Sequence, residues 1–340
     1  MLYELLRTVL FRLNAEKSHH FGMGGIKALD NLNLSSLLYP APVATPVEVM
    51  GLKFPNRVGM AAGLDKNGDY LKALSALGFG FIEVGTVTPR PQPGNPKPRM
   101  FRLQEVEGII NRMGFNNLGV DYLVEQVKTA QVDSIVGINI GKNIDTAVED
   151  AVSDYLIGLE KVYSEADYIA INISSPNTPG LRKLQFGESL RALLGALKEK
   201  QVALSQQNNR YVPMAVKVAP DLDESEVQEL AEAFVSHEID AVIATNTSMA
   251  RDKVLGSKHA EEAGGLSGRP IFEHSTAIVR QFREALPDTL PIIAAGGVMS
   301  GDDGVKKLEA GASLVQIYSG FIYQGPALVA QIINSIERNN

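Results

Sequence analysis

The sequence predicts a closed (β/α)8 barrel, the TIM-barrel fold, preceded by a separate helical extension. From residue 57 onward, eight short apolar runs rich in Val, Ile and Ala alternate with eight segments of helical periodicity. Strand–helix units repeated in this way are typical of a barrel. An open doubly wound sheet is the alternative, but such a sheet rarely contains eight parallel repeats in one domain. The number of repeats therefore favours the barrel.

The predicted strands and helices follow one another in strict order along the chain. The strands are predicted at residues 57–63, 80–86, 134–141, 167–174, 212–220, 240–246, 290–297 and 313–319. A helix is predicted after each strand, at residues 67–77, 117–131, 146–163, 188–205, 223–236, 271–285, 300–310 and 326–337. Before the first strand, residues 47–54 alternate around Gly51 and predict a small hairpin that closes the barrel floor.

The first 40 residues are predicted to form a domain of their own. Residues 40–46 (PAPVATP) read as a linker, which divides the chain into an N-terminal helical domain at 1–40 and a barrel domain at 41–340. The first helix carries one apolar stripe, formed by Leu2, Leu5, Leu6, Val9, Leu10 and Leu13. The periodicity is equally consistent with a stripe that packs on the barrel and with one that lies in a membrane interface.

Composition excludes several kinds of site. The chain has a net charge of −7, which disfavours nucleic-acid binding, and it contains no cysteine. Without cysteine there is no disulfide, iron–sulfur cluster or cysteine base. The five histidines lie at no metal-ligand spacing, so we expect no metal. No run of about 18 apolar residues and no signal-peptide pattern is present, so we expect neither a membrane span nor export.

Polar residues stand near the ends of four consecutive predicted strands. They are Asn139, Asn172, Lys217 and Thr245, each between apolar neighbours that suit the helix-facing side of a strand. Strand alternation then turns all four toward the barrel mouth, where catalytic groups of this fold lie. A lone inward asparagine is often only a satisfied core residue. A group of four, including a lysine that is costly to bury alone, indicates a planar polar ligand.

Glycine-rich loops and one long connection complete the predicted site. Segments 294–304 and 317–326 place glycines between a strand and a helix, where backbone N–H groups can bind phosphate, although glycines can also mark tight turns. Together with the polar group this suggests flavin mononucleotide (FMN). The connection 86–116 reads as a lid or binding insertion, and Lys66 lies at the mouth. Asparagines with a lysine suit a substrate that carries amides and a carboxylate.

Several longer motifs resemble a known family across essentially the whole chain. They are AAGLDKNG, EVGTVTPRPQPGNPKPR, NRMGFNN, GINIGKN, INISSPNTPGLR, VKVAPD, ATNT, GGLSGRP and SLVQIYSGF. The chain resembles the membrane-associated, quinone-dependent (class 2) dihydroorotate dehydrogenases of bacteria. The resemblance implies oxidation of dihydroorotate to orotate in pyrimidine (UMP) synthesis, with hydride transfer to one FMN per chain and electron transfer to a quinone.

The resemblance also implies which residues bind. The flavin contacts it implies are Ala62, Gly63, Thr86, Asn139, Asn172, Lys217, Thr245, Gly268, Gly297, Tyr318 and Ser319. The orotate-side residues it implies are Lys66, Asn111, Arg112, Met113, Gly114, Phe115, Asn172, Asn177, Asn246 and Thr247. It further implies a monomer attached peripherally to the cytoplasmic face of the inner membrane through the N-terminal helices, which would also admit the quinone.

The loop after the fourth strand carries the remaining catalytic role. Loss of a hydride from one ring carbon must be matched by loss of a proton from its neighbour, so a general base is needed. The resemblance assigns this base to Ser175, whereas strand alternation would turn Ser174 inward instead. Thr178 is the nearest candidate to relay the proton, and a simple loop-capping role for the two serines is the alternative. A soluble flavin enzyme with another electron acceptor and a non-redox phosphate-binding barrel are the competing functions.

Overall fold

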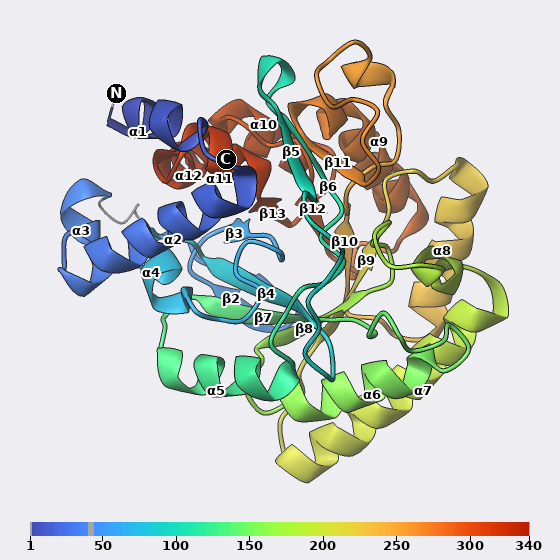
Figure 1. The fold of residues 1–340 in the computed structure, drawn as a ribbon. Helices are drawn as coiled ribbons and strands as arrows, with labels where there is room; N and C mark the ends of the chain where they lie inside the picture. The colour runs from blue at the N-terminus through green and yellow to red at the C-terminus, as the bar shows by residue number, and fades with distance from the viewer. Residues whose placement is uncertain (1, 40–43, 340) are drawn as a thin grey trace.

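The computed structural model describes residues 2–39 and 44–339, in which eight parallel strands close a barrel surrounded by helices (Figure 1). The barrel strands are β3 (Val58–Met60), β4 (Phe81–Val87), β7 (Ile135–Ile140), β8 (Tyr168–Asn172), β9 (Met214–Val218), β10 (Ala241–Ala244), β12 (Ile292–Ala295) and β13 (Leu314–Ile317). Neighbours in the barrel follow chain order, and β13 pairs with β3 to close it. The predicted barrel is confirmed, and the open-sheet alternative is wrong.

A helix follows every barrel strand, as predicted. The helices are α4 (Leu71–Ser75), α5 (Val120–Ala130), α6 (Ala151–Val162), α7 (Gly187–Asn208), α8 (Glu224–Ser236), α9 (Phe272–Ala285), α10 (Gly301–Glu309) and α12 (Ala327–Asn339). The first is shorter than its predicted span of 67–77. The buried Asp65 carboxylate accepts the backbone N–H groups of Gly68, Asp69 and Tyr70 at 2.8–3.0 Å, which holds this stretch as a loop.

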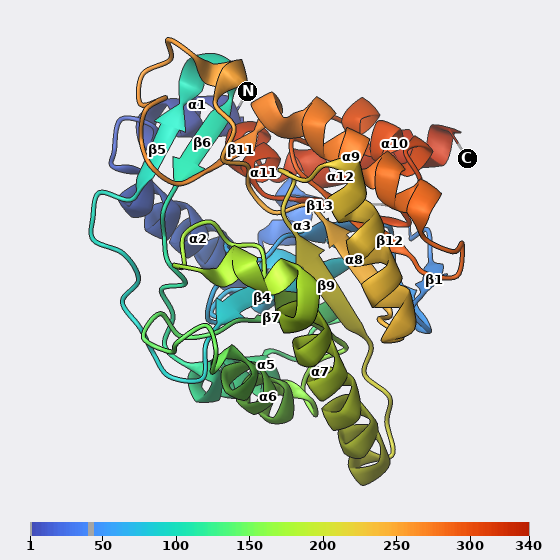
Figure 2. The ribbon, with the colours of Figure 1, turned by 90° about the vertical axis from the view of Figure 1, so that its right-hand side faces the viewer.

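The floor of the barrel is apolar and covered by the predicted hairpin. Strands β1 (Val47–Val49) and β2 (Leu52–Phe54) pair antiparallel, and Phe54 packs edge-on against Phe81 at 5.4 Å between ring centroids. Tyr168 stands beside Phe81 in the same buried cluster. The hairpin lies at the opposite end of the barrel from the N-terminal helices (Figure 2). Only the other end of the barrel is therefore left for ligands.

The connections at the mouth build a second small sheet. Strands β5 (Met100–Leu103) and β6 (Gly108–Asn111) form a hairpin within the predicted lid, and β11 (Gly265–Gly268) pairs with β6. Short connecting helices are α11 (Ser319–Gln324) and the 3-10 turns η1 (Gln104–Val106), η2 (Leu181–Gln185), η3 (Asp252–Val254) and η4 (Arg269–Ile271). The predicted lid is thus an ordered sheet, tied to the loop that follows β10.

The N-terminal segment forms α1 (Leu2–Leu10), α2 (Ala15–Asn31) and α3 (Ser35–Leu38). Part of the predicted linker and the predicted domain boundary, residues 40–43, lies outside the described residues. Helix α1 contacts α11, and α2 contacts α4 and β5. Glu16 of α2 binds Arg99 at 2.6 Å and Lys97 at 3.2 Å. The extension is therefore fastened to the barrel through its second helix and a salt-bridged cluster.

Four residues of the apolar stripe are largely exposed, although Leu6 and Leu10 of the same stripe also line an apolar cavity that is described below. Leu5, Leu6, Val9 and Leu13 expose 70%, 50%, 61% and 38% of their surface. Polar residues of the opposite face make the contacts instead, because Tyr3 Oη donates to the carbonyl of Ile322 at 2.7 Å. Within the described residues no helix is long and apolar enough to cross a bilayer.

We predict that Gly137→Ala destabilises the fold. Gly137 lies on β7 directly against the ring of Tyr168, and a Cβ atom at this position would overlap that ring. Overpacking of this kind costs about 1–3 kcal/mol, measurable by urea unfolding. Gly24→Ala in α2, where no atom lies within 4 Å of the added carbon, is the control and should be neutral or stabilising. Equal stability of Gly137→Ala and the wild type would contradict this view of the barrel interior.

Candidate active site

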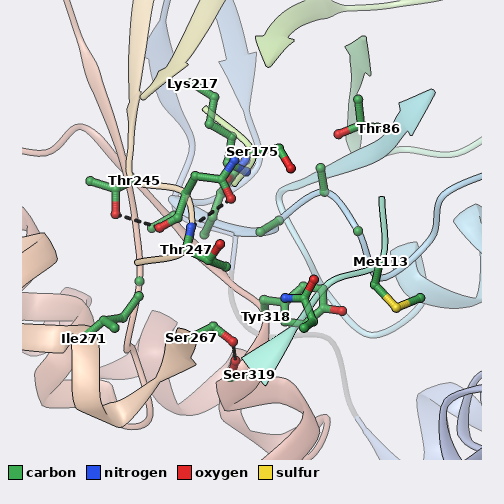
Figure 3. A pocket seen from close by; sticks show the side chains of 18 of the residues that line it. Thr86, Met113, Ser175, Lys217, Thr245, Thr247, Ser267, Ile271, Tyr318 and Ser319 are labelled. Carbon is green, nitrogen blue, oxygen red and sulfur yellow. Dashed lines mark hydrogen bonds between the residues drawn. The ribbon is translucent and has the colours of Figure 1, made fainter. Parts of the chain in front are cut away.

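A cavity opens at the C-terminal ends of the barrel strands (Figure 3). Residues from β4, β8, β9, β12 and β13, from the loop after β10 and from the lid sheet line it together. Lys217, Thr245 and Ser175 lie toward one end of the view, and Ser267 and Ser319 lie toward the other. Parallel strands of a barrel deliver side chains to one mouth in this way. The cavity therefore collects residues that are far apart in the sequence.

The inward orientation predicted for the strand-end residues is confirmed by their contacts. Asn172 Nδ2 donates to Thr86 Oγ1 at 2.8 Å, and Thr86 Oγ1 donates to Asn139 Oδ1 at 2.5 Å. Lys217 and Asn172 line the cavity, whereas Asn139 is fully buried one layer deeper, behind Thr86. Asn139 thus orients the lining residues and does not itself reach the cavity surface.

A buried carboxylate beneath the cavity is a feature that we did not predict from the sequence. Glu83 on β4 has no exposed surface, and four donors from four other strands surround it. They are Asn139 Nδ2 at 2.8 Å, Lys217 Nζ at 3.4 Å, Tyr168 Oη at 3.0 Å and Gln316 Nε2 at 2.6 Å. Burial, followed by the charge of Glu83, raises the pKa of Tyr168 well above its usual value, so that hydroxyl remains a donor. Glu83 is therefore the counter-ion that allows Lys217 to be buried.

Most of the predicted site residues line this one cavity. They are Ala62, Gly63, Lys66, Thr86, Asn111, Met113, Gly114, Phe115, Asn172, Asn177, Lys217, Thr245, Asn246, Thr247, Gly268, Gly297, Tyr318, Ser319 and Ser175. Lining residues that the sequence reasoning did not single out include Ser267, Ile271 and Gln316. The glutamine could have been recognised as a polar residue inside an apolar strand, the same signal that marked Lys217.

Two predicted site residues, Asn139 and Arg112, do not line the cavity, and the side chain of Arg112 lies away from it. Its guanidinium donates to Glu262 at 2.8 Å and to the carbonyl of Pro98 at 3.0 Å, and it stacks over the ring of Phe101. Its backbone N–H donates to the carbonyl of Arg99 at 2.9 Å. Arg112 thus fastens the lid sheet to the loop after β10, while Asn111 and Met113 on either side line the cavity.

One end of the cavity is built from small and hydroxyl residues. Ser267 and Ser319 hydrogen bond to each other at 2.9 Å, and both line the cavity with Gly268 and Gly297. Gly268 and Gly297 have φ values of +95° and +77°, in the region that favours glycine. A side chain at either position would also collide with backbone, since a Cβ on Gly297 would lie 2.5 Å from Phe272 Cα. The glycines are needed for close packing here, so this end can offer backbone groups and hydroxyls to a ligand.

The two serines after β8 have different surroundings. Ser175 lines the cavity, and its hydroxyl accepts the backbone N–H of Asn177 at 3.3 Å. Ser174 is fully buried outside the lining, where its hydroxyl accepts a hydrogen bond from Asn246 Nδ2 at 3.1 Å. Strand alternation therefore favoured the serine that does not face the cavity. The chain has already left the strand at Asn172, so parity no longer applies at residue 175.

An arginine joins the loops on either side of Ser175. Arg182 donates to the carbonyl of Ser174 at 3.1 Å and to the carbonyl of Thr247 at 2.9 Å. It also forms an ion pair with Asp221 at 2.9 Å. The loops after β8, β9 and β10 are thereby held in one arrangement, which limits the movement of the cavity residues that they carry.

Two titratable residues at the edge of the cavity have shifted pKa values. Burial, followed by the nearby Arg99 guanidinium, lowers the pKa of Lys66 to about 8. Burial raises the pKa of Tyr318 to about 12, so its hydroxyl stays protonated. An anionic ligand beside Lys66 would favour the charged amine. The cavity can therefore present two ammonium groups, Lys66 and Lys217, to a negatively charged substrate.

A second, apolar cavity of about 380 Å³ lies between the N-terminal helices and the barrel. Leu10, Phe11, Met23, Ile26 and Phe321 are among the residues that line it. His19 and Arg102 add polar groups, and burial, followed by the charge of Lys66, lowers the pKa of His19 to about 3, which keeps it neutral. The segment Tyr318–Ile322 separates the two cavities, since Tyr318, Ser319 and Gly320 line the first and Phe321 and Ile322 the second.

The fold and the cavity define a barrel enzyme that binds a polar ligand at the C-terminal face. A family model described as "Dihydroorotate dehydrogenase" matches residues 45–339. The chain belongs to this family. It is 58% identical to the dihydroorotate dehydrogenase (quinone) of Aliivibrio fischeri strain MJ11, over 99% of this chain and 100% of that one. The protein of the same name from Pseudomonas aeruginosa is 56% identical, over 98% of each chain.

The solved structures give the same assignment. The structure of dihydroorotate dehydrogenase from Eimeria tenella in complex with ferulenol superposes with a TM-score of 0.86 at 34% identity. The alignment covers 97% of this chain and 94% of that one. The similarity therefore includes the N-terminal helices as well as the barrel.

We predict that Glu83→Gln strongly destabilises the protein. The substitution leaves Lys217 charged inside the barrel without its anion, and breaking a buried pair typically costs about 3–5 kcal/mol. Urea unfolding measures the loss, and adding Lys217→Met to Glu83→Gln should restore part of it. Glu160→Gln, which removes the partner of Lys200 from an exposed pair, is the control and should change the midpoint little. A Glu83→Gln protein as stable as this control would show that the pair is not the central interaction.

Proposed function

We propose that this chain oxidises dihydroorotate to orotate with FMN at the barrel mouth and passes the electrons to a membrane quinone. The observation that carries the proposal is the pair of cavities, one polar and one apolar, on the two sides of the segment 318–322. An enzyme that couples a charged substrate to a lipophilic acceptor needs two sites of this kind. The names of its closely similar relatives support the same reaction.

The residues of the polar cavity fit FMN. Glycines and hydroxyls at one end suit a phosphate, and a buried Lys217 with Asn172 and Thr245 suits the edge of a polar planar ring. The Oε1 atom of Gln316 is buried without a hydrogen-bond partner among the described residues and belongs to a residue that lines the cavity. FMN bound here would supply the two-electron oxidation. Lys217 would place a positive charge beside the flavin, which favours its reduced, anionic form.

The substrate would lie over the flavin, against the lid and the loops after β8 and β10. Asn111, Asn177 and Asn246 line this side of the cavity, and their amides can pair with the amide edge of dihydroorotate. The ammonium of Lys66 can bind the carboxylate. Asn177 Nδ2 already donates to Asn111 Oδ1 at 3.3 Å, so the lid and the β8 loop approach each other at this point.

Ser175 is the proposed general base. It faces the cavity between two rigid features, Pro176 in the loop and the arginine-held carbonyl of Ser174. A serine must pass the abstracted proton on. The hydroxyl of Thr178 is buried without a hydrogen-bond partner among the described residues, which leaves it available for such a relay. Among the residues that the structure describes, no carboxylate or histidine lines the cavity, so we propose a route through hydroxyl groups.

The N-terminal domain, residues 1–40, is the proposed membrane and quinone-access domain. The exposed stripe of α1 can enter a lipid interface, while Tyr3 and the guanidinium of Arg7 hold the helix on α11. A quinone ring would then reach the apolar cavity, where Arg102 can donate to its oxygens. This arrangement implies a protein peripherally attached at the cytoplasmic face of the inner membrane, which we propose is a monomer.

The flavin spectrum tests both the cofactor and the base. We expect a yellow protein whose flavin absorbance bleaches when dihydroorotate is added without oxygen. In Ser175→Ala the bleaching should slow by about 10²–10⁴-fold, because a general base contributes that much. Ser174→Ala, whose hydroxyl lies outside the cavity lining, is the matched control and should stay within about tenfold of wild type. A colourless protein would support the phosphate-binding alternative, and a Ser175→Ala rate near wild type would refute the base.

The exposed stripe is tested by the triple variant Leu5→Gln, Val9→Gln and Leu13→Gln. These side chains are exposed and do not line the apolar cavity, so folding should be unaffected. We expect loss of binding to lipid vesicles and slower turnover with long-chain quinones, with unchanged anaerobic reduction by dihydroorotate. The matched control is Val202→Gln, Val235→Gln and Leu255→Gln, at exposed apolar positions elsewhere. Full vesicle binding by the triple α1 variant would contradict the proposed membrane face.

A further inference from the structure

A buried lysine outside the cavity has no role in the chemistry described above. Lys307 lies on α10 with no exposed surface, and its Nζ atom donates to Ser275 Oγ at 2.7 Å. Its ammonium also lies 4.9 Å from the centroid of the Phe272 ring. Burial lowers the pKa of Lys307 to about 7, although the charges of Asp303 and Glu273 oppose that shift. Burying an amine is energetically costly, and a role in ligand binding would explain why one is buried here.

Ser275 connects this lysine to the wall of the cavity. Its hydroxyl oxygen accepts from Lys307 and has its own hydrogen directed to carbonyl oxygens, with Gly296 O at 3.0 Å and Phe272 O at 3.1 Å. Gly296 and Gly297 follow β12 and both line the cavity. The contact is close enough that a Cβ on Gly296 would lie 2.7 Å from Ser275 Oγ. The Ser275 hydroxyl therefore connects Lys307 directly to the glycine loop.

The geometry of a peptide bond carries the effect of this contact into the cavity. In a planar trans peptide the C=O and N–H groups point in opposite directions. When Ser275 holds the carbonyl of Gly296, the N–H of Gly297 is directed away from α9, on the side where Gly297 borders the cavity. A hydroxyl that accepts a hydrogen bond from an ammonium becomes a stronger donor. The Lys307 contact therefore strengthens the hydrogen bond from Ser275 to the Gly296 carbonyl.

Within the described part of the chain, this end of the cavity has no positively charged lining residue. Its lining residues include Ser267, Gly268, Gly296, Gly297 and Ser319, while the amines of the cavity, Lys66 and Lys217, belong to the loop after β3 and to β9. A dianionic phosphate bound there would meet hydroxyl and backbone donors only. A phosphate at this end would favour the protonated form of Lys307 behind the glycine loop, which then supplies the missing charge, because charges in a low-dielectric interior interact over longer distances than in water.

We propose that Lys307 is a positioning residue and buried counter-charge for the phosphate of the cofactor, acting through Ser275 and the Gly296–Gly297 peptide. The inference rests on the proposed function, because it takes FMN as the ligand. According to this inference, Lys307 makes the protein bind FMN more tightly than riboflavin, which has the same ring and no phosphate.

Competition between the two flavins tests this selectivity in the holoenzyme. Protein carrying FMN is equilibrated with increasing riboflavin, and released FMN is separated by ultrafiltration and quantified. The ratio of the riboflavin to the FMN dissociation constant should fall about tenfold in Lys307→Met, since a hydrogen-bonded charge is lost. Ser275→Ala should lower the ratio in the same direction, and it keeps the test open if the methionine variant fails to fold. Lys306→Met, an exposed lysine on the same helix, should leave the ratio unchanged.

Each outcome bears on the proposal. A ratio in Lys307→Met within twofold of wild type would overturn it, even if both affinities fall together, because equal losses indicate only a general structural role. A lower ratio in Lys307→Met and Ser275→Ala, with the wild-type ratio in Lys306→Met, would support it. A wild-type protein that holds no flavin would refute the proposed function together with this inference, which distinguishes the two failures.

Discussion

The buried pair of Glu83 and Lys217 is the interaction on which the rest of the site depends. Glu83 stands on β4 and is bonded from β7, β8, β9 and β13, so one carboxylate connects five of the barrel strands. Below it the interior is filled by Phe54, Phe81 and other apolar side chains. Above it the cavity begins. A charge at this boundary must be fully paired, and the pairing fixes Lys217, Asn139 and Gln316 in the orientations that shape the cavity floor.

The same fold places a polar cavity and an apolar cavity close together. The polar cavity is enclosed by barrel strands that bring fixed donors and acceptors, whereas the apolar cavity lies outside the barrel, between α2 and the barrel wall. The segment 318–322 borders both of them, as do residues 63–64 and strand β6. Separation by these segments keeps water-soluble and lipid-soluble ligands apart while leaving a short path between them. The fold thus places a polar and an apolar cavity side by side.

Regular periodicity decided how much of this could be predicted from the sequence. Asn139, Asn172 and Lys217 were predicted to point inward because strands alternate with period two. Glu83 carries the same signal in a fully buried strand, but it lies in the first half of β4, away from the strand end where ligand-binding groups of a barrel are expected. The lid sheet was missed because β11 pairs with β6 from more than 150 residues away, and four-residue strands show little alternation. The Arg112 side chain could not be placed without its partner Glu262, which is equally distant.

The N-terminal helices show the limit of what hydrophobic periodicity can predict. The leucine stripe of α1 identified an apolar face, but periodicity alone gave no reason to prefer barrel or lipid as its partner. In the structure, Tyr3 and Arg7 on another face of α1 make the contacts to α11. They donate to the carbonyls of Ile322 and Tyr323 at 2.7 and 2.5 Å. These polar side chains fix the helix, and Leu5, Val9 and Leu13 are left exposed, whereas Leu6 and Leu10 line the apolar cavity. Because those carbonyls belong to α11, next to the segment that separates the cavities, any ligand-driven shift of that segment would be felt at the exposed face.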